Sequence, residues 1–248
     1  MKRYGLIGKS LSHSFSPSFF KAFYQEKEID ATYETFELSE INEVQKVFDL
    51  QPEGLNVTIP YKESILPFLD EVLGVANEIQ AVNTIKFENG KTYGLNTDAH
   101  GFHQSIKPFL TNKHEKALIL GTGGAAKSVV HVLKNLGIEV LFATRNPENM
   151  PKHFGYSEIN EHFLKACKLI VNTTPLGMYP NVNEEHTFQL LGISDEHLVV
   201  DLIYNPEKTL LLQKSEKLGA TILNGESMLR EQALMSWDLW NKPISQIS

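Results

Sequence analysis

The chain has 248 residues, and its 23 basic and 30 acidic side chains give a net charge of −7. This length suits one large α/β domain or two smaller ones, and the acidic balance disfavours nucleic acid as a partner, because phosphates require a positive contact surface. The single cysteine, Cys167, excludes an internal disulfide, and no apolar run reaches the length of a membrane span, so we expect a cytoplasmic protein with no membrane partner.

Short apolar segments alternate with segments of helical period from end to end. This pattern is typical of strands joined by crossover helices in a mostly parallel sheet. In the first hundred residues it predicts five strands, at 4–7, 32–36, 54–57, 82–87 and 93–95. The last two are expected to form a hairpin through an Asn89-Gly90 turn. Helices are expected at 17–27, with Ser16 as the N-cap, and at 41–49.

From residue 116 the alternation starts again and predicts a second α/β unit. Its expected elements are a strand at 117–120, a helix at 125–136, and strands at 139–143, 169–172, 198–201 and 221–223. The final helix, at 227–240, has apolar residues at helical spacing and therefore needs a surface to pack on. We expect it to return to the first lobe, so that residues 1–100 with 226–248 form one domain, residues 101–225 form the other, and ligands bind in the cleft between them.

A glycine-rich loop follows the first strand of the second unit and opens its helix. The residues of this loop are Gly121-Thr122-Gly123-Gly124-Ala125-Ala126. They fit the dinucleotide fingerprint, in which the first glycine makes the tight turn and the second lets the backbone approach the pyrophosphate. Free N–H groups at the helix N-terminus then hold the phosphates. The alternative is a glycine turn that merely joins a strand to a helix.

The strand after this helix ends at Thr144 and Arg145, where an NAD-binding chain usually places an acidic residue for the ribose 2′-hydroxyl. Arg145 can instead pair with a 2′-phosphate and stack on adenine, which favours NADP. The absent acidic residue also argues against an S-adenosylmethionine site. The alternative is that Arg145 is a solvated side chain at a strand end.

Polar clusters lie at the ends of the first-lobe strands, where an α/β sheet presents its ligand-binding residues. Ser14 and Ser16 could present two hydroxyls to one anionic group, although singly they are more typical of a turn and a cap. Lys62 and Asp98 form the one oppositely charged pair among these clusters. A lysine beside a carboxylate in a partly dry cleft can donate and accept a proton, whereas an exposed pair of this kind contributes little.

Together, the motifs closely resemble those of the shikimate dehydrogenase family. They run in order through nearly the whole chain: Ser-x-Ser-Pro, Asn-Val-Thr-Ile-Pro-x-Lys, Ala-Val-Asn-Thr, Asn-Thr-Asp, the glycine loop, Asn-Thr-Thr-Pro-Leu-Gly-Met at 172–178, Asp-Leu-Ile-Tyr-Asn-Pro at 201–206, and a closing segment at 225–232. One such motif is weak evidence, but eight in sequence are specific. The resemblance implies an N-terminal α/β substrate domain and a Rossmann-like NADP-binding domain with a parallel sheet.

The resemblance also implies an activity, the NADP-dependent reversible reduction of 3-dehydroshikimate to shikimate in chorismate and aromatic amino-acid biosynthesis. Lys62 and Asp98 would form the catalytic pair. The residues implied to hold the substrate are Ser14, Ser16 and Tyr204 at the carboxylate, and Thr58, Asn83 and Gln232 at the ring hydroxyls, with Lys62 and Asp98 beside them. The residues implied to hold NADP are Gly121, Gly123, Gly124 and Ala125 at the loop, Thr144 and Arg145 at the 2′-phosphate, and Thr173, Leu202, Gly225 and Met228 near the nicotinamide half.

The chain departs from the family pattern at three places. Thr144 precedes Arg145 where the family usually has Asn, and no second basic residue follows in the run to Asn149, so one arm of the cationic clamp is missing and NADP preference is expected to be looser. Gln80 stands where a small residue is common. The stretch 146–157 is short for the helix that usually follows.

Several alternatives remain at this point. The chain could be a quinate/shikimate dehydrogenase with relaxed cofactor use, or a non-catalytic protein of the same fold that senses NADP or a metabolite. His100 and His103 have a metal-like spacing, but no third ligand is apparent nearby, so we expect no metal. Trp237 and Trp240 are expected to be packing residues. The small-molecule ligands are compatible with a monomer or a homodimer.

Overall fold

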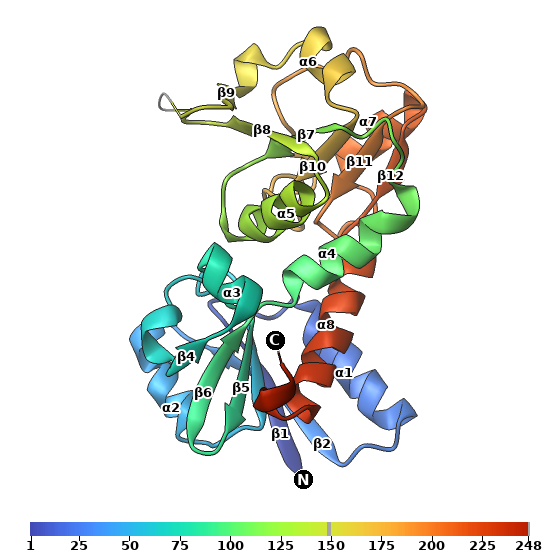
Figure 1. The fold of residues 1–248 in the computed structure, drawn as a ribbon. Coiled ribbons are helices and arrows are strands. Elements are labelled where there is room, and N and C mark those ends of the chain that lie inside the picture. Colours follow the sequence, from blue (N-terminus) through green and yellow to red (C-terminus); the bar gives the residue numbers. More distant parts are fainter. Residues whose placement is uncertain (148–149, 248) are drawn as a thin grey trace. The chain divides into compact units, whose positions relative to one another are not determined.

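The computed structural model describes residues 1–147 and 150–247, and contacts divide the chain into two compact units (Figure 1). The first unit comprises Met1–Gly101 together with Leu229–Ser248, and the second comprises Phe102–Met228. Within the described ranges, no helix is long and apolar enough to cross a membrane.

The first unit is built on a six-stranded mixed sheet with the order β2-β1-β3-β5-β6-β4. The strands are β1 (Lys2–Gly8), β2 (Ala31–Glu37), β3 (Gly54–Val57), β4 (Glu71–Val72), β5 (Thr84–Glu88) and β6 (Lys91–Leu95). β1 runs parallel to β2 and β3, but β5 is antiparallel to both β3 and β6. The expected hairpin turn causes the reversal between β5 and β6, since Asn89 and Gly90 both have positive φ, as a tight two-residue turn requires. The expected hairpin is therefore confirmed, and it makes the sheet of the first unit mixed at this edge.

Helices cover both faces of this sheet (Figure 1). They are α1 (Phe15–Glu26), α2 (Val44–Phe48), α3 (Gly74–Ile79), the start of α4 (Asp98–Ile106) and most of α8 (Glu226–Asn241). The apolar cluster of α1 and α8 includes Tyr4, whereas the cluster under α2 includes Ile7, so the two layers pack on opposite faces.

Two helix boundaries differ from those expected. The first helix begins at Phe15 with Ser14 as its N-cap, so Ser16 lies inside the first turn and is not the cap. Pro17 gave the misleading signal, because its missing N–H is tolerated anywhere in the first turn, where N–H groups have no helical partner. The helix expected at 41–49 is a 3-10 turn, Ile41–Glu43, followed by the five-residue α2.

The last helix does return to the first unit, as expected from its apolar face. Trp240 is 5% exposed, and its ring stacks on Tyr4 with the centroids 4.9 Å apart. Its indole Nε1 donates to the Ile85 carbonyl at 3.0 Å. Gly54 provides the space, since a Cβ there would lie 2.3 Å from the indole ring. The prediction that the tryptophans are packing residues is confirmed for Trp240, and Trp237 also packs edge-on against Tyr4.

The second unit contains a six-stranded, wholly parallel sheet with the order β12-β11-β10-β7-β8-β9. Its strands are β7 (Lys116–Leu120), β8 (Glu139–Thr144), β9 (His153–Gly155), β10 (Leu169–Asn172), β11 (Leu198–Asp201) and β12 (Thr221–Leu223), and its own helices are α5 (Gly124–Asn135), α6 (Glu161–Ala166) and α7 (Leu210–Lys217). This is the expected Rossmann-like order with a parallel sheet. Cys167 is fully buried in the apolar core, as expected of a small hydrophobic residue, and burial raises its thiol pKa to about 11.

A buried lysine ties the end of α8 to the first sheet and generates a stability prediction. Lys86 is 5% exposed, donates to the Trp240 carbonyl at 2.8 Å and lies 3.3 Å from the Glu88 carboxylate. Lys86→Met should lower the free energy of unfolding by about 1–3 kcal/mol, because it leaves a buried carbonyl without a donor. Lys91→Met is the control, because Lys91 lies in the same hairpin as Lys86 and forms an exposed ion pair with Glu71 of β4. In urea denaturation it should lower the free energy of unfolding far less than Lys86→Met does. Equal losses would show that the buried contact has no special weight.

Candidate functional site

Lys62 and Asp98, predicted from the sequence as a proton-transfer pair, are in contact within the first unit. Lys62 Nζ donates to Asp98 Oδ2 at 2.7 Å, and their side chains are 16% and 7% exposed. Lys62 lies in the turn region after β3, where its carbonyl accepts from the Val82 N–H at 2.8 Å, and Asp98 is the first residue of α4. The pair is therefore largely withdrawn from water, unlike an ordinary surface ion pair.

Asn83 holds the other oxygen of the carboxylate. Its Nδ2 donates to Asp98 Oδ1 at 2.9 Å, so Asp98 is fixed by one bond at each oxygen. The orientation of the Asn83 amide is set in turn by the Thr97 backbone N–H, which donates to Asn83 Oδ1 at 2.7 Å. Gln232 reaches this group from α8, with its Oε1 3.4 Å from Asn83 Nδ2. The structure thus brings together four predicted residues, Lys62, Asn83, Asp98 and Gln232.

Beneath these four lies a buried polar cluster that the sequence reasoning did not assign. Its hub is Thr84, whose Oγ1 is 2.9 Å from Ser236 Oγ and 3.2 Å from both Thr97 Oγ1 and Asn56 Nδ2. Asn56 Nδ2 also donates to Ser236 Oγ at 2.9 Å. Asn56, Thr84 and Thr97 belong to recognisable motifs, so the motifs were the available signal. Ser236 had only its helical position, four residues after Gln232 and hence on the same face of α8.

The two serines of the first motif lie at the start of α1 but differ in environment. Ser14 is half-buried and makes no side-chain capping bond to the helix. Ser16 is 7% exposed and hydrogen-bonds to Tyr33, whose hydroxyl donates to Asn56 Oδ1 at 2.8 Å. Thr58 follows β3 directly, and its N–H donates to the Ile7 carbonyl at 2.9 Å. Ser16 is thus connected through Tyr33 and Asn56 to the cluster that supports Asp98.

Gln80 now has a structural explanation. It ends α3 in the left-handed conformation, with φ 53° and ψ 48°. Residues with small or short polar side chains, glycine above all, adopt this conformation most easily, which explains why a small residue is common here. The Gln80 side chain bonds back to the Asn77 carbonyl at 2.6 Å, which stabilises the turn before Asn83.

The glycine loop of the second unit has the conformation that its sequence predicts. Gly121 has φ +96°, and a Cβ there would lie 2.6 Å from the Thr174 methyl, so both backbone and packing require glycine. Gly123 is the N-cap of α5 in extended conformation, and a Cβ there would meet nothing within 4 Å. Nothing in the protein itself requires glycine at 123, whereas a phosphate group close to the backbone would. Together with the free N–H groups that begin α5, this open space fits a dinucleotide pyrophosphate.

The other predicted cofactor residues lie at the carboxyl ends of neighbouring strands of this sheet. Gly124 and Ala125 begin α5. Thr144 ends β8, and the exposed Arg145 follows it. Burial raises the pKa of the Tyr156 hydroxyl, and the charge of Arg145 offsets part of this increase. The stretch 146–157, which looked short for the helix that usually follows Arg145, contains the strand β9 instead. Glu148 and Asn149, the last residues of the segment in which a second basic residue was sought, lie outside the described residues.

Close backbone contacts join the segments after β10, β11 and β12. Thr173 Oγ1 donates to the Leu120 carbonyl at 2.8 Å, which ties the segment after β10 to the end of β7. A Cβ on Gly225 would lie 2.1 Å from the Leu202 carbonyl oxygen, so glycine is required there by the approach of the two segments. Met228 is 7% exposed near the start of α8. Tyr204 follows β11 in this unit and is half-buried, which raises the pKa of its hydroxyl.

The sequence reasoning also missed a buried carboxylate in this unit. Asp201, the last residue of β11, is 0% exposed and bonds to Asn172, Ile203 and Thr209. Burial raises its pKa to about 6.

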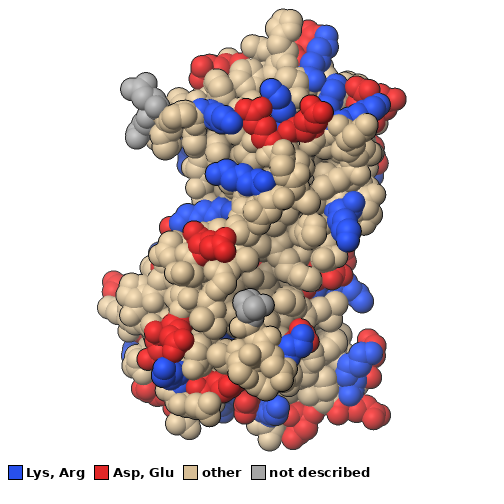
Figure 2. Space-filling model, in the orientation of Figure 1, with Lys and Arg blue, Asp and Glu red and all other residues tan. Residues whose placement is uncertain are grey.

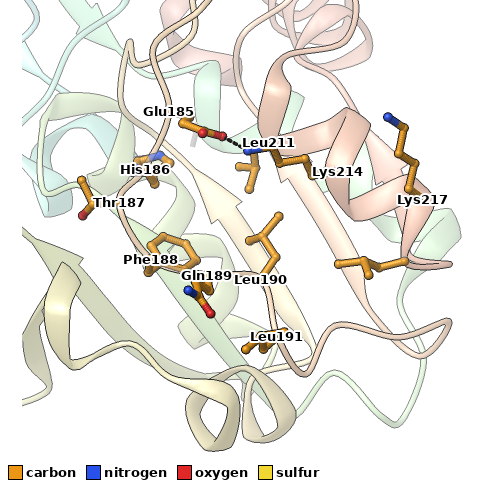
Figure 3. A pocket seen from close by; sticks show the side chains of 11 residues that line it. Glu185, His186, Thr187, Phe188, Gln189, Leu190, Leu191, Leu211, Lys214 and Lys217 are labelled. Carbon is orange, nitrogen blue, oxygen red and sulfur yellow. Dashed lines mark hydrogen bonds and ion pairs between the residues drawn. The ribbon is translucent and has the colours of Figure 1, made fainter.

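A cavity of about 780 Å³ also opens in the second unit (Figure 3). Leu190, Leu191, Leu211 and Leu218 give it an apolar lining, and none of the residues predicted from the sequence lies in it. No set of three or more His, Cys, Asp or Glu side chains that could hold a metal ion occurs in the part of the chain that the structure describes. Basic and acidic side chains are interspersed on the face shown in Figure 2.

Comparisons with known proteins match nearly the whole chain to one family. The family model for the shikimate dehydrogenase substrate binding domain matches residues 6–85. The shikimate dehydrogenase (NADP(+)) of Aquifex aeolicus is 39% identical over 248 aligned residues, which cover 96% of this chain and 90% of that protein.

Two solved structures extend the comparison to the fold. The shikimate 5-dehydrogenase of Thermus thermophilus, in complex with NADP(H) and shikimate, is 28% identical with a TM-score of 0.85 and covers 97% of this chain and 94% of its own. The quinate dehydrogenase of Corynebacterium glutamicum, in complex with NAD, is 27% identical with a TM-score of 0.85 and covers 97% of this chain and 93% of its own.

The two glycines of the loop predict opposite phenotypes. Gly123→Ala should leave thermal unfolding unchanged but weaken binding of NADP at least roughly tenfold in titration calorimetry, because the new methyl occupies the space of a phosphate. Gly121→Ala should lower the free energy of unfolding by about 1 kcal/mol or more, since alanine is strained at positive φ and meets Thr174. Wild-type NADP affinity in Gly123→Ala would contradict the assignment of the loop to the pyrophosphate.

Proposed function

Because the chain belongs to the shikimate dehydrogenase family, we propose that it catalyses the NADP-dependent, reversible reduction of 3-dehydroshikimate to shikimate, with Lys62 and Asp98 as the catalytic pair. The observation that supports this most directly is the withdrawn ion pair, 2.7 Å long, with Asn83 and Gln232 placed beside it. A protein that only senses a metabolite has no need of a proton donor held in this way.

Lys62 is the group that moves a proton. In the reductive direction its ammonium donates a proton to the substrate oxygen, which gains negative charge as the carbonyl is reduced. NADPH, when bound, supplies the hydride for the carbonyl carbon. In the oxidative direction the same amine accepts the proton from the substrate hydroxyl. The ammonium also lowers the energy of the developing alkoxide through its charge, which is more effective in a site shielded from water.

Asp98 positions Lys62 and has a second function toward the substrate. Its Oδ2 accepts from Lys62, which directs the ammonium, while its Oδ1 is held by Asn83. A carboxylate oxygen has further lone pairs, so Asp98 can accept from a ring hydroxyl without releasing Lys62. Asn83 and Gln232 offer amide groups to the other ring hydroxyls, and Thr58 offers a hydroxyl. This distribution of neutral donors and acceptors suits a polyhydroxylated ring.

The substrate carboxylate is assigned to Ser14, Ser16 and Tyr204. Ser14 supports this assignment best, because its hydroxyl makes no capping bond and lies beside the positive end of α1. Tyr33 donates its hydroxyl to Asn56, so the bond between Ser16 and Tyr33 uses the single proton of Ser16, and Ser16 can donate to an anion only by releasing Tyr33.

The second unit is assigned to NADP. Gly121, Gly123, Gly124 and Ala125 would hold the pyrophosphate at the start of α5, and Thr144 with Arg145 would hold the 2′-phosphate. Thr173, Leu202, Gly225 and Met228 would lie at the nicotinamide half, which agrees with the position of their segments at the carboxyl ends of the parallel strands.

We also propose where the enzyme acts and in which oligomeric state. The enzyme acts in the cytoplasm, which is supported by its single cysteine being buried and unpaired. Its ligands are small molecules, and it acts as a monomer or a homodimer.

The residues expected at the 2′-phosphate suggest a second candidate substrate and cofactor. Arg145 is the one basic residue in the run 144–147, and a similar protein binds NAD and is named a quinate dehydrogenase. Relaxed use of quinate and NAD is therefore the alternative that this chain's own residues favour.

Replacing Lys62 tests the catalytic assignment. Lys62→Ala should lower kcat roughly 10²–10⁴-fold in both directions, because proton transfer is lost, while KM for shikimate changes only a few-fold. Lys91→Ala, an exposed lysine of the same unit, is the control and should leave both constants unchanged. A raised KM with wild-type kcat would make Lys62 a binding residue.

A four-way assay tests the substrate and the cofactor. Nicotinamide absorbance is followed with shikimate or quinate, each with NADP or NAD. We expect the highest kcat/KM for shikimate with NADP. In Arg145→Ala, the ratio of kcat/KM for NADP to that for NAD should be lower than in the wild type. Equal KM values for NADP and NAD in the wild type would remove the role of Arg145, and no turnover with any pair would favour a sensor.

A further inference from the structure

Two neighbouring strands of the second sheet end on side chains that face each other. Asn172 ends β10, Asp201 ends β11, and the two residues are register partners across the parallel pair. Asn172 Nδ2 donates to Asp201 Oδ1 at 3.0 Å. Because ligands of such sheets bind at the carboxyl ends of the strands, this contact lies directly beneath the segments assigned to the cofactor.

Burying the carboxylate of Asp201 in this position lowers the stability of the fold. Asp201 is 0% exposed, and in the part of the chain that the structure describes no lysine or arginine forms an ion pair with it. Its partners are neutral donors, since Ile203 N–H donates to Oδ1 at 3.1 Å and the Thr209 hydroxyl donates to Oδ2 at 2.6 Å. A charge without a cation costs stability on burial, and burial raises the pKa of Asp201 to about 6. Such a group calls for a reason other than stability.

Asp201 orients Asn172, and Asn172 shapes the turn that follows β10. With its Nδ2 committed to Asp201, Asn172 turns its Oδ1 toward Thr174, which donates from its backbone N–H at 3.0 Å and from Oγ1 at 2.7 Å. Thr174 then packs against Gly121, and its neighbour Thr173 donates to the Leu120 carbonyl. The carboxylate thus orders the turn after β10, whereas the glycine loop has its own support, since the Gly121 N–H donates to the Ala143 carbonyl at 2.9 Å.

The same carboxylate shapes the segment that follows β11. Ile203 is held by its N–H bond to Asp201, and its carbonyl accepts from the Gly225 N–H at 3.0 Å. Leu202 N–H donates to the Asn172 carbonyl at 3.0 Å. Three of the four residues assigned to the nicotinamide half, Thr173, Leu202 and Gly225, therefore lie in segments that the Asn172–Asp201 pair holds.

We propose that Asp201 is a positioning residue for the cofactor, which fixes the segments after β10 and β11 in the arrangement that receives the nicotinamide half of the dinucleotide. This inference rests on the proposed function. It predicts that the network acts mainly on one half of the ligand, since the 2′-phosphate is assigned to Thr144 and Arg145 and the pyrophosphate to the glycine loop, none of which Asp201 contacts.

The experiment compares two ligands on the full chain. Binding of NADP and of 2′,5′-ADP, which lacks the nicotinamide half, is measured by calorimetry for wild type and Asp201→Asn at pH 7.5. We expect Asp201→Asn to weaken NADP binding about tenfold and 2′,5′-ADP binding less than about twofold, with KM for shikimate unchanged. Asp195→Asn, an exposed carboxylate of the same unit, is the control and should change neither ligand.

A second pair of variants guards against simple misfolding. Thr209→Val removes the hydroxyl that donates to Asp201 Oδ2, and Thr209→Ser retains it. If Asp201 positions the cofactor segments, Thr209→Val weakens NADP relative to 2′,5′-ADP, and Thr209→Ser restores the wild-type ratio. Loss of thermal stability with an unchanged ratio would show that the network is only structural and would overturn the proposal.

The pH dependence of the same ratio is a further readout. As pH falls through about 6, Asp201 takes up a proton, so the wild-type preference for NADP over 2′,5′-ADP should approach that of Asp201→Asn measured at the same pH. His186, the titratable group that reaches Asp201 through Asn172 Oδ1 at 3.3 Å, remains neutral in this range because burial lowers its pKa to about 4. The 2′-phosphate is common to both ligands, but the 5′-phosphate of 2′,5′-ADP is a monoester that itself titrates at about pH 6. The readout is therefore the difference between wild type and Asp201→Asn at each pH, because both proteins share this ligand titration.

The outcomes separate this inference from the function on which it rests. If wild type bound neither NADP nor 2′,5′-ADP, the proposed function would fail. If wild type bound both and Asp201→Asn weakened both equally, the function would stand and the positioning role would be wrong.

Discussion

The hydrogen bond between Asn83 and Asp98 is the contact on which the arrangement of the first unit depends. Lys62 alone could hold Asp98 in several rotamers, but a second donor at Oδ1 leaves the carboxylate one orientation. Asn83 can act in this way only because Thr97 N–H occupies its Oδ1 and thereby decides which side of the amide faces Asp98. Since these groups are buried, each rotation would leave a polar atom unsatisfied, and the cluster around Thr84 and Ser236 extends this constraint to α8.

In the second unit, a different pair of residues, Asn172 and Asp201, fixes the orientation of the polar groups at the sheet edge. The sheet of this unit is wholly parallel, so the segments assigned to the cofactor emerge side by side and have no hairpins to hold them. Asp201 and Asn172 provide a cross-link at this edge, and Thr209 connects it to the N-terminus of α7. In both units, therefore, an asparagine amide is held by a backbone or carboxylate partner and in turn fixes a group in the proposed site.

The sequence was most informative about short buried strands. The strands at 54–57, 169–172, 198–201 and 221–223 have their predicted bounds, because each is a short, mainly apolar segment between polar, glycine or proline residues. Helix starts were less certain, since Pro17 fits any position of a first turn, and β9 and α6 were missed because neither carries a long periodic pattern. Motif residues could be found from spacing alone.

Their supporting residues could not be found in this way, because Ser236 and Asp201 act through contacts that only the folded chain brings together. A net charge of −7 makes this local support necessary. The overall field repels an anionic substrate and an anionic cofactor, so each must be bound by donors whose directions are already fixed. Gly123 is the simplest example of such a fixed donor site. The space above it is open, and the helix dipole of α5 is the main attraction for a phosphate there. A donor that had to reorient on binding would lose part of that attraction to conformational entropy, which is why the buried clusters beneath the ligand-binding residues matter as much as those residues themselves.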